Sequence, residues 1–247
     1  MNRVAAIMTP SLEILDAKDT HLGPLVLRRR TIPSLDGLEV YEVKLGEEFL
    51  MSSLFPEAEK ELAKMGLAKL KGENWEVVVG GLGLGYTAAA ALESKNVRSL
   101  VVVELFPQVI EWHQRGLVPV GKQLSGDPRC RMVVQDFFAA AVDREVGLDP
   151  QNPGKKFNAI LLDIDHTPSH QLDDENSGFY SIGGLMGMAD QLLPGGVFGL
   201  WSDDLPDASF TELLGTVFQT ADAIVVPFYN PIQDKEASNT VYLAQKG

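Results

Sequence analysis

Six short apolar runs recur from Trp75 onward, and they limit the possible folds of this chain more than any other feature. Amphipathic stretches separate most of them. Uninterrupted Val, Ile and Leu are typical of strands that are buried on both faces, as in a parallel sheet covered by helices. The runs are WEVVVG, RSLVVVE, RMVV, FNAILLD, GVFGLWS and AIVVPFY, and the amphipathic stretches are 86–95, 107–115, 137–145, 179–193 and 207–219.

A seventh run, NTVYLAQ, follows the sixth with no helix between them. Two strands joined directly are expected to pair antiparallel, because a parallel pair needs a longer crossover. The sequence therefore predicts an α/β fold whose seven-stranded sheet is mostly parallel, with an antiparallel last strand.

The part before these runs has a different pattern, with short strands expected over 23–31, 38–45 and 48–51. These strands resemble a small β meander. An amphipathic stretch, SSLFPEAEKELAKMGLAKL, then predicts a linking helix. We therefore expect two domains: the meander with its helix over 1–70, and the larger α/β domain over 71–247.

Charge and length exclude several classes of protein. The 247 residues include 34 acidic and 21 basic ones, for a formal charge of −13, which disfavours nucleic acid and anionic membranes as partners. No apolar run reaches the ~18 residues that suggest a transmembrane helix, so a cytoplasmic protein is expected. The single Cys130 excludes an intrachain disulfide and any multi-cysteine metal site.

Three alternating glycines, Gly81, Gly83 and Gly85, follow the first run and precede a helical stretch. Ligands of open α/β sheets bind beyond the carboxyl ends of the strands, and glycine lets backbone amides approach them closely. The dinucleotide motif G-x-G-x-x-G/A would place its last small residue at Tyr86, so the spacing fits NAD poorly. It fits the nucleoside–sulfonium loop of methyltransferase-type folds better. The alternative is a tight turn packed against the sheet.

Two acids at the next strand ends favour a nucleoside ligand. Glu104 ends the second run, and its carboxylate could accept hydrogen bonds from both ribose hydroxyls. Asp136 follows the third run and could accept one from an adenine amine, with Phe137 as an apolar neighbour. Leu105, directly after Glu104, joins this group. We therefore predict adenosine bound across the first three strand ends.

Asp163 follows the fourth run and is the candidate catalytic residue. A carboxylate there could attract an amine, orient it toward the sulfonium and accept its proton. Asp165 would add negative charge, and Trp201, at the end of the fifth run, could line the acceptor pocket. His166 and His170 lie nearby, but their spacing matches no strong metal-binding signature, so no metal is expected.

In order along the chain, VVVGGLGLG, VVVE, VVQDFF, FNAILLDIDHTP, LLPGGVFGLWS and VVPFYNP resemble the spermidine synthase (aminopropyltransferase) family. The resemblance implies a Rossmann-like methyltransferase fold. It also implies transfer of an aminopropyl group from decarboxylated S-adenosylmethionine to a di- or polyamine, as in polyamine biosynthesis. It assigns Glu104 to the ribose, Asp136 to the adenine, Asp163 to the nucleophilic amine, and Tyr229 to substrate contact. Since members of the family are usually dimers or tetramers, it implies a homo-oligomer.

The amine-binding half of the family pattern is altered in this sequence. The family's glycine loop, G-G-G-D-G-G, has an Asp that grips the donor amine, and Gly83 occupies that position here. D-S-S-D-P becomes DIDHTP, and the family's Tyr-Gln/His-Glu segment falls on 51–53. Two alternatives therefore stay open: a methyltransferase that uses S-adenosylmethionine itself, and a relative that binds a nucleoside without catalysis.

Overall fold

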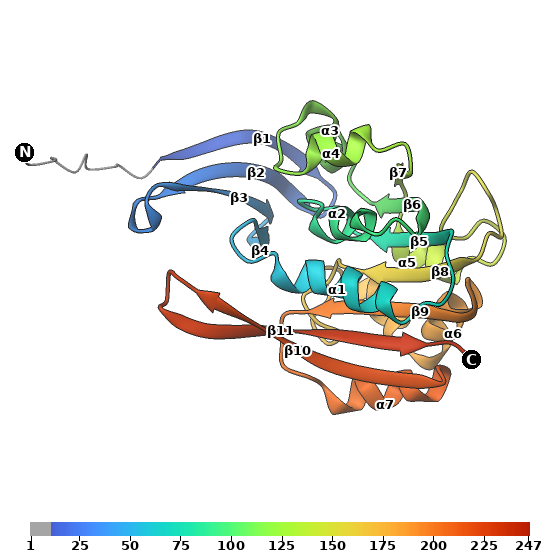
Figure 1. Ribbon diagram of the computed structural model, residues 1–247. Helices are drawn as coiled ribbons and strands as arrows, with labels where there is room; N and C mark the ends of the chain where they lie inside the picture. The colour runs from blue at the N-terminus through green and yellow to red at the C-terminus, as the bar shows by residue number, and fades with distance from the viewer. Residues whose placement is uncertain (1–10) are drawn as a thin grey trace, which may run out of the picture. The chain divides into compact units, whose positions relative to one another are not determined.

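The computed structural model describes residues 11–247, with only the backbone of Asp174 (Figure 1). The chain forms two compact units. The smaller contains the described residues up to Phe55 together with Tyr229–Glu236, and the larger contains Pro56–Phe228 and Ala237–Gly247. The sequence analysis predicts the domain boundary at residue 70, after the linking helix. In the structure this helix, α1 (Glu57–Ala68), belongs to the larger unit, because its apolar face packs on that unit's sheet.

The smaller unit contains a four-stranded antiparallel meander in the order β1-β2-β3-β4. Glu42 is buried on β3 and accepts hydrogen bonds from Nε of Arg28 (2.7 Å) and of Arg30 (2.6 Å), which lie on one face of β2. The meander is confirmed, although the sequence analysis does not anticipate its first strand. The strands are β1 (Leu12–Thr20), β2 (Gly23–Ile32), β3 (Leu38–Leu45) and β4 (Glu48–Ser52).

The larger unit is built on a seven-stranded sheet in the order β10-β11-β9-β8-β5-β6-β7. β9, β8, β5, β6 and β7 pair in parallel, and β11 pairs antiparallel with β9. The predicted α/β fold, with its antiparallel last strand, is confirmed. The strands are β5 (Trp75–Gly80), β6 (Val97–Glu104), β7 (Cys130–Val134), β8 (Phe157–Leu162), β9 (Leu192–Ser202), β10 (Thr220–Asn230) and β11 (Lys235–Gln245).

Helices cover both faces of this sheet, which is why the central strands contain little but apolar residues. One face packs against α5, α6 and α7, with Phe137, Leu185 and Leu214 in a single buried cluster. On the opposite face α1 packs against α2, β8 and β9. The helices are α2 (Tyr86–Glu93), α3 (Pro107–Arg115), α4 (Gly121–Gly126), α5 (Phe137–Val142), α6 (Ile182–Asp190) and α7 (Ala208–Val217), with short 3-10 turns at Pro33–Leu35 and Asp174–Tyr180.

The parallel strands all end at one edge of the sheet, so their carboxyl ends bring together residues that are far apart in sequence. β5 pairs with β8 on one side and β6 on the other, which places the ends of the first, second and fourth apolar runs side by side. Within residues 11–247 no helix is both long and apolar enough to cross a membrane.

Candidate active site

The loop after β5 is held against the end of β8. Gly81 has a φ of +88°, and a Cβ on it would lie 2.1 Å from the backbone oxygen of Asp163. The Asp163 N–H donates to the Gly80 oxygen (2.8 Å), and the Gly81 N–H donates to the Val103 oxygen (2.9 Å). Only glycine at 81 permits this approach, so the glycine loop and Asp163 are positioned by the same contact.

Gly85 and His113 anchor the far side of the loop. Gly85 is the N-terminal cap of α2 with a φ of +90°, and a Cβ there would lie 2.6 Å from Cε1 of His113. His113 is fully buried, and its Nε2 lies 2.9 Å from the Gly83 oxygen. Burial lowers the pKa of His113 and this contact opposes the shift, so the neutral ring donates to Gly83. Within the described residues, no side chain caps the N-terminus of α2.

Glu104, the predicted ribose ligand, ends β6 directly beside this loop. Oε2 accepts the Leu82 N–H (2.9 Å) and Oε1 accepts the Phe106 N–H (2.9 Å). Burial raises the pKa of Glu104, and these backbone donors oppose that rise. The backbone N–H groups of Gly83 and Leu105 also donate to this carboxylate, so a ribose hydroxyl would share its oxygens with these donors. Glu104 therefore shapes the glycine loop, and its ribose contact stays a prediction.

The other three predicted nucleoside residues lie at the ends of β6 and β7. Leu105 is exposed, and Asp136 caps α5 by accepting the N–H groups of Phe138 (2.8 Å) and Ala139 (3.2 Å) with Oδ1. Phe137 is 2% exposed and packs beneath the loop, where a Cβ on Gly80 would lie 2.5 Å from its ring. Phe137 thus supports the floor of the glycine loop, and direct contact with a nucleoside is untested for all three.

Asp163 lies half-buried at the end of β8, on the face of the sheet that α1 and α2 cover. Its Oδ2 accepts a hydrogen bond from the Thr87 hydroxyl of α2 (2.6 Å). Burial raises the pKa of Asp163 to about 6, and the Thr87 bond works against this rise. A carboxylate that is ionised at neutral pH but protonated just below it suits a general base.

A second carboxyl group, which the sequence analysis misses, lies close to Asp163. Glu59 of α1 is 5% exposed, and its backbone oxygen accepts from the same Thr87 hydroxyl at 3.3 Å. Burial, followed by the charge of Asp163, raises the pKa of Glu59 to about 8. The signal was present, because Glu59 stands three, four and seven residues before Leu62, Ala63 and Gly66, which form the buried stripe of α1.

Asp165, the predicted substrate residue, is buried in the loop that follows β8. Its Oδ1 accepts the Leu172 N–H (2.9 Å) and its Oδ2 accepts the Tyr180 hydroxyl (2.7 Å). Burial raises the pKa of Asp165, while these two bonds oppose the shift. In this structure Asp165 ties the 165–180 loop together, and a direct role toward a substrate stays a prediction.

The two aromatic residues that are predicted to contact the substrate, Trp201 and Tyr229, lie in different units. Trp201 is near the end of β9, and its indole Nε1 is buried with no hydrogen-bond partner among residues 11–247. A buried donor without a hydrogen-bond partner destabilises the folded state. A polar group of a bound ligand would satisfy this N–H. Tyr229 is exposed in the smaller unit and its hydroxyl donates to Asp234. Substrate contact by either side chain stays a prediction.

Metal binding has no support in the part of the chain that the structure describes. No group of three or more His, Cys, Asp and Glu side chains there could hold an ion. His166 and His170 face each other with ring centroids 5.2 Å apart.

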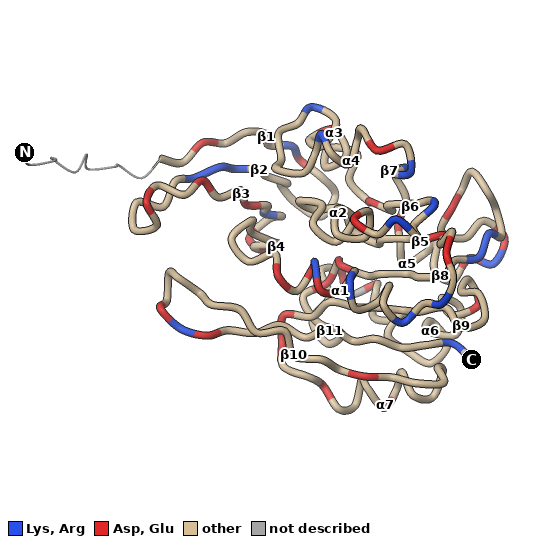
Figure 2. The backbone as a smooth tube through the Cα atoms, viewed as in Figure 1, with Lys and Arg blue, Asp and Glu red and all other residues tan. Residues whose placement is uncertain are grey.

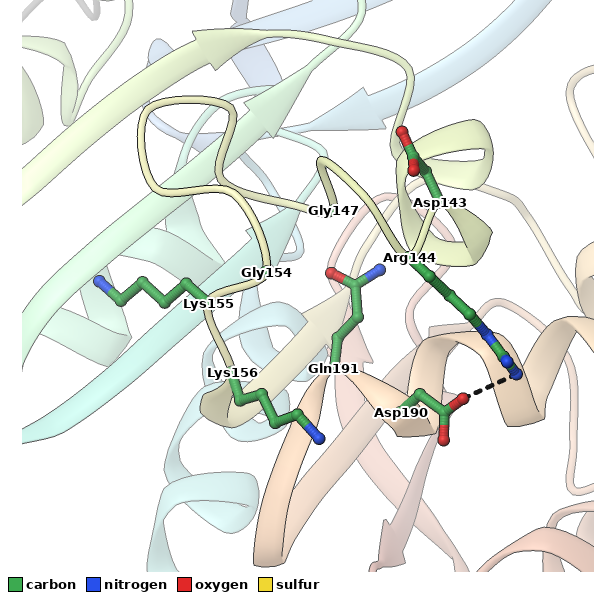
Figure 3. A pocket seen from close by; sticks show the side chains of 8 residues that line it. All are labelled: Asp143, Arg144, Gly147, Gly154, Lys155, Lys156, Asp190 and Gln191. Carbon is green, nitrogen blue, oxygen red and sulfur yellow. Dashed lines mark ion pairs between the residues drawn. The ribbon is translucent and has the colours of Figure 1, made fainter.

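A hollow of about 330 Å³ lies at the opposite, amino edge of the sheet (Figure 3). Lys155 and Lys156 precede β8, and Asp190 and Gln191 precede β9, so their position is far from the carboxyl ends. Arg144 already pairs with Asp190 across its rim (2.8 Å). This hollow is separate from the strand-end residues described above.

Comparison with known proteins places the fold. The sequence matches no protein-family model and no curated protein. A spermidine synthase in complex with the transition state analogue AdoDATO superposes with a TM-score of 0.69 and 17% identity, over 95% of this chain and 74% of that one. Spermidine synthase from Thermotoga maritima gives 0.66 and 17%, over 95% and 73%. Human methyltransferase-like protein 13 in complex with SAH gives 0.54 and 18%, over 77% and 82%.

The chain therefore has the Rossmann-like methyltransferase fold. More particularly, its fold is spermidine-synthase-like, because those matches cover 95% of the chain while the methyltransferase-like protein covers 77%. The resemblance found in the sequence is confirmed at this level. The reaction is a separate question, since fold alone does not determine function.

Proposed function

We propose that this protein is a transferase that moves an aminopropyl group from decarboxylated S-adenosylmethionine to a di- or polyamine. The observation that carries the proposal is the position of Asp163. Its backbone packs on Gly81 and its carboxylate, with a pKa of about 6, is held by Thr87. Spermidine synthases share the fold at 17% identity, which supports a donor of this kind.

In the proposed reaction the strand ends of β5, β6 and β7 bind the nucleoside. The amine nitrogen attacks the aminopropyl carbon next to the sulfonium, the carbon–sulfur bond breaks, and its electron pair goes to sulfur to leave methylthioadenosine. The nitrogen loses a proton, which the Asp163 carboxylate accepts. Holding the amine in line removes much of the entropic barrier. No step requires a metal.

Methyl transfer from intact S-adenosylmethionine is the second candidate, and Gly83 is the observation that favours it. A glycine there leaves no acidic side chain to repel the carboxylate of the intact donor. The same attack on the methyl carbon would leave S-adenosylhomocysteine. A nucleoside-binding relative without activity is the third candidate, and the half-buried Asp163 carboxylate with its raised pKa argues against it.

Calorimetry with methylthioadenosine, S-adenosylmethionine and its decarboxylated form separates these candidates. We expect the decarboxylated donor to bind tighter than the intact one, and aminopropyl transfer to putrescine or spermidine to follow. Tighter binding of the intact donor, with methyl transfer, would replace the first proposal by the second. Binding of methylthioadenosine without transfer to any acceptor would favour the third.

We also propose that the protein acts as a homodimer or tetramer, in the cytoplasm, on a small amine and not on nucleic acid or a membrane. The acidic composition supports a cationic small substrate, since a charge of −13 attracts amines. Size-exclusion chromatography with light scattering measures the oligomeric state, and a monomer at micromolar concentration would contradict that part.

A further inference from the structure

Glu59 combines two features that rarely occur together in a side chain without a ligand. It is 5% exposed, and its Oε2 is buried with no hydrogen-bond partner among residues 11–247. Acidic side chains are almost never fully buried unless they are paired, and a buried unpaired carboxylate is strongly unfavourable. The Glu59 carboxyl group has a hydrogen bond from its own backbone N–H, and Oε2 is the atom that lacks a partner within the described residues.

The packing of α1 places Glu59 above the end of the sheet. Lower on the helix, a Cβ on Gly66 would lie 2.9 Å from Leu161 of β8, and Leu62 lies 2.8 Å from the Cβ position of Gly199 on β9. Glu59 is the next inward residue toward the start of α1. Strand residues alternate between faces, so the next inward residue is Asp163 after Leu161 and Trp201 after Gly199. Asp163 has a raised pKa, and the indole N–H of Trp201 has no hydrogen-bond partner among the described residues.

Thr87 lies between the Asp163 carboxylate and the backbone of α1 at Glu59. Its hydroxyl lies 2.6 Å from Oδ2 of Asp163 and 3.3 Å from the backbone oxygen of Glu59. A hydroxyl has one proton to donate, and the shorter contact takes it. The Thr87 bond occupies Oδ2 of Asp163, and Oε2 of Glu59 has no hydrogen-bond partner among the described residues.

Negative charges predominate around Glu59 and Asp163. Asp163 from the end of β8 and Glu57 from α1 act on Glu59 as like charges, and Lys60 from α1 is the opposing one. From α2, the neutral Thr87 faces the pair and the Tyr86 ring lies 5.4 Å from the Lys60 ammonium. No basic side chain forms an ion pair with Glu59 or Asp163 within the described residues. At neutral pH the two groups together hold about one proton, since the pKa of Glu59 is raised to about 8 and that of Asp163 to about 6.

We propose that Glu59 and Asp163 together bind one primary alkylammonium group, with Glu59 as a second acidic ligand that α1 supplies. An ammonium has three N–H donors, which match one oxygen of each carboxyl group and leave one donor for water or a further acceptor. The group could belong to the amine acceptor or to the aminopropyl tail of the donor. The inference rests on the proposed function, because that function is what brings an amine to Asp163.

Binding of the ammonium should displace the proton that the pair shares, and this release can be counted. We suggest calorimetric titration at pH 7 in two buffers of different ionisation enthalpy, with putrescine, decarboxylated S-adenosylmethionine and methylthioadenosine as separate ligands. The test variant is Glu59→Gln, and the matched control is Glu61→Gln on the same helix. In the parent, Glu61 is partly exposed and pairs with Lys64. Thermal unfolding confirms that each variant is folded.

We expect the parent and Glu61→Gln to release a fraction of a proton when they bind the amine, up to about one. In Glu59→Gln the release should vanish and the amine affinity should fall about 10-fold or more, while methylthioadenosine, which has no ammonium, binds as before. Glu59→Asp keeps the charge and should retain the release. If Glu59→Gln does not fold, Glu59→Ala, which also removes the carboxyl group, serves as the test and should lose the release. The ligand that shows the effect, putrescine or the donor, identifies the source of the ammonium.

Equal amine affinity and equal proton release in Glu59→Gln and the parent would overturn the inference, even if the parent transfers an aminopropyl group. A parent that binds neither putrescine nor the decarboxylated donor would also overturn it. A Glu59-dependent proton release in a parent without any transfer activity would instead support the ammonium site and contradict the proposed reaction.

Discussion

The two edges of the parallel sheet both contain buried carboxyl groups, and they differ in how these groups are paired. At the amino edge, Glu76 of β5 pairs with Lys155 (2.7 Å) and with Nε of Arg98 (2.8 Å). Burial alone would raise the pKa of Glu76, but these two basic partners bring it below its ordinary value. Figure 2 shows the basic segments at the starts of β6 and β7 and in the loop before β8.

Asp149 follows the same rule at this edge. Its side chain is fully buried and pairs with Arg131 at 2.5 Å. Burial would raise its pKa, and the hydrogen bonds from Arg131 and Asn152 lower it instead. At the carboxyl edge, by contrast, Glu59 and Asp163 have raised pKa values and no basic partner in the described part of the chain.

The difference separates carboxyl groups that stabilise the fold from those that the fold merely tolerates. A paired group contributes stability, whereas an unpaired buried group reduces it unless a ligand supplies the missing cation. A proton held by Glu59 limits that cost at neutral pH. We therefore expect substitutions at the amino edge to affect stability, and substitutions at the carboxyl edge to affect activity and binding.

The largest effect is expected from Asp163→Asn. The substitution keeps the shape but removes the proton acceptor, so transfer should slow by roughly 10²–10⁴. Its stability at pH 7 should be equal to or above that of the parent, because a buried charge is removed. Steady-state transfer from each donor and urea unfolding measure both quantities. Full activity of this variant would show that Asp163 has a structural role only. The proposed difference between the two edges of the sheet would then be wrong for its main residue.

Glu104→Ala should show both kinds of effect, because this carboxylate serves the loop and the predicted ribose site. Two charge-assisted bonds to ribose are each worth about 1.5–3 kcal/mol, so methylthioadenosine should bind on the order of 100-fold more weakly. The N–H groups of Leu82 and Phe106 also lose their acceptor, which should cost about 2 kcal/mol or more of stability.

Calorimetry and denaturant unfolding measure these two losses for Glu104. Glu104→Gln keeps an acceptor for one backbone donor and should lose less stability than the Ala variant. Unchanged nucleoside binding in a folded Ala variant would show that Glu104 acts only on the loop.

Asp149→Asn tests the amino edge. Loss of the charge-assisted bond from Arg131 should reduce the free energy of unfolding at pH 7 by about 1.5–3 kcal/mol. The folded-state pKa of Asp149 lies below its ordinary value. Its stabilisation is therefore present above the unfolded pKa and declines as the pH falls through the folded one.

Urea unfolding of the Asp149→Asn variant and the parent between pH 3 and 7 follows this dependence. The difference between them should shrink toward the acid end, and nucleoside binding should not change. A difference that is independent of pH would mean that the charge of Asp149 is not what stabilises this edge.

Thr87→Val should have the smallest effect. The Thr87 hydroxyl opposes the burial of Asp163, so its removal should raise the pKa of that carboxyl further. The rate falls when Asp163 is protonated, and the acid limb of the pH–rate profile should therefore move upward by up to about one unit. Thr87→Ser keeps the hydroxyl and should leave the limb in place. If the acid limb of the pH–rate profile does not move in either variant, Thr87 does not affect the pKa of Asp163.

Much of the carboxyl edge could be read from order along the chain. Glu104, Asp136 and Asp163 each follow an apolar run, and parallel strands bring their ends to one edge whatever the details of packing. The glycine loop was recognisable for the same reason, since a strand, a turn with positive φ and a helix follow each other in sequence.

Glu59, Thr87 and His113 could not be assigned in the same way. Each lies inside a helix that was correctly predicted, and its spacing places it on the buried face. Spacing does not say what that face meets. His113 meets the Gly83 oxygen and Thr87 meets Asp163 only because α3 and α2 pack where they do. The strand β1 was missed because its residues are mostly exposed and its apolar positions are few.

The sequence by itself determined the α/β order, the glycine loop and the acids at the strand ends, because these depend on local periodicity and on the common direction of parallel strands. Only the tertiary structure decided which carboxyl groups are paired. The sequence does not distinguish the environments of Glu76 and Glu59. In the structure Glu76 pairs with Arg98 and Lys155, whereas Glu59 lies near the like charge of Asp163. The charge of a buried group is set by what surrounds it in space, and those neighbours come from distant parts of the chain.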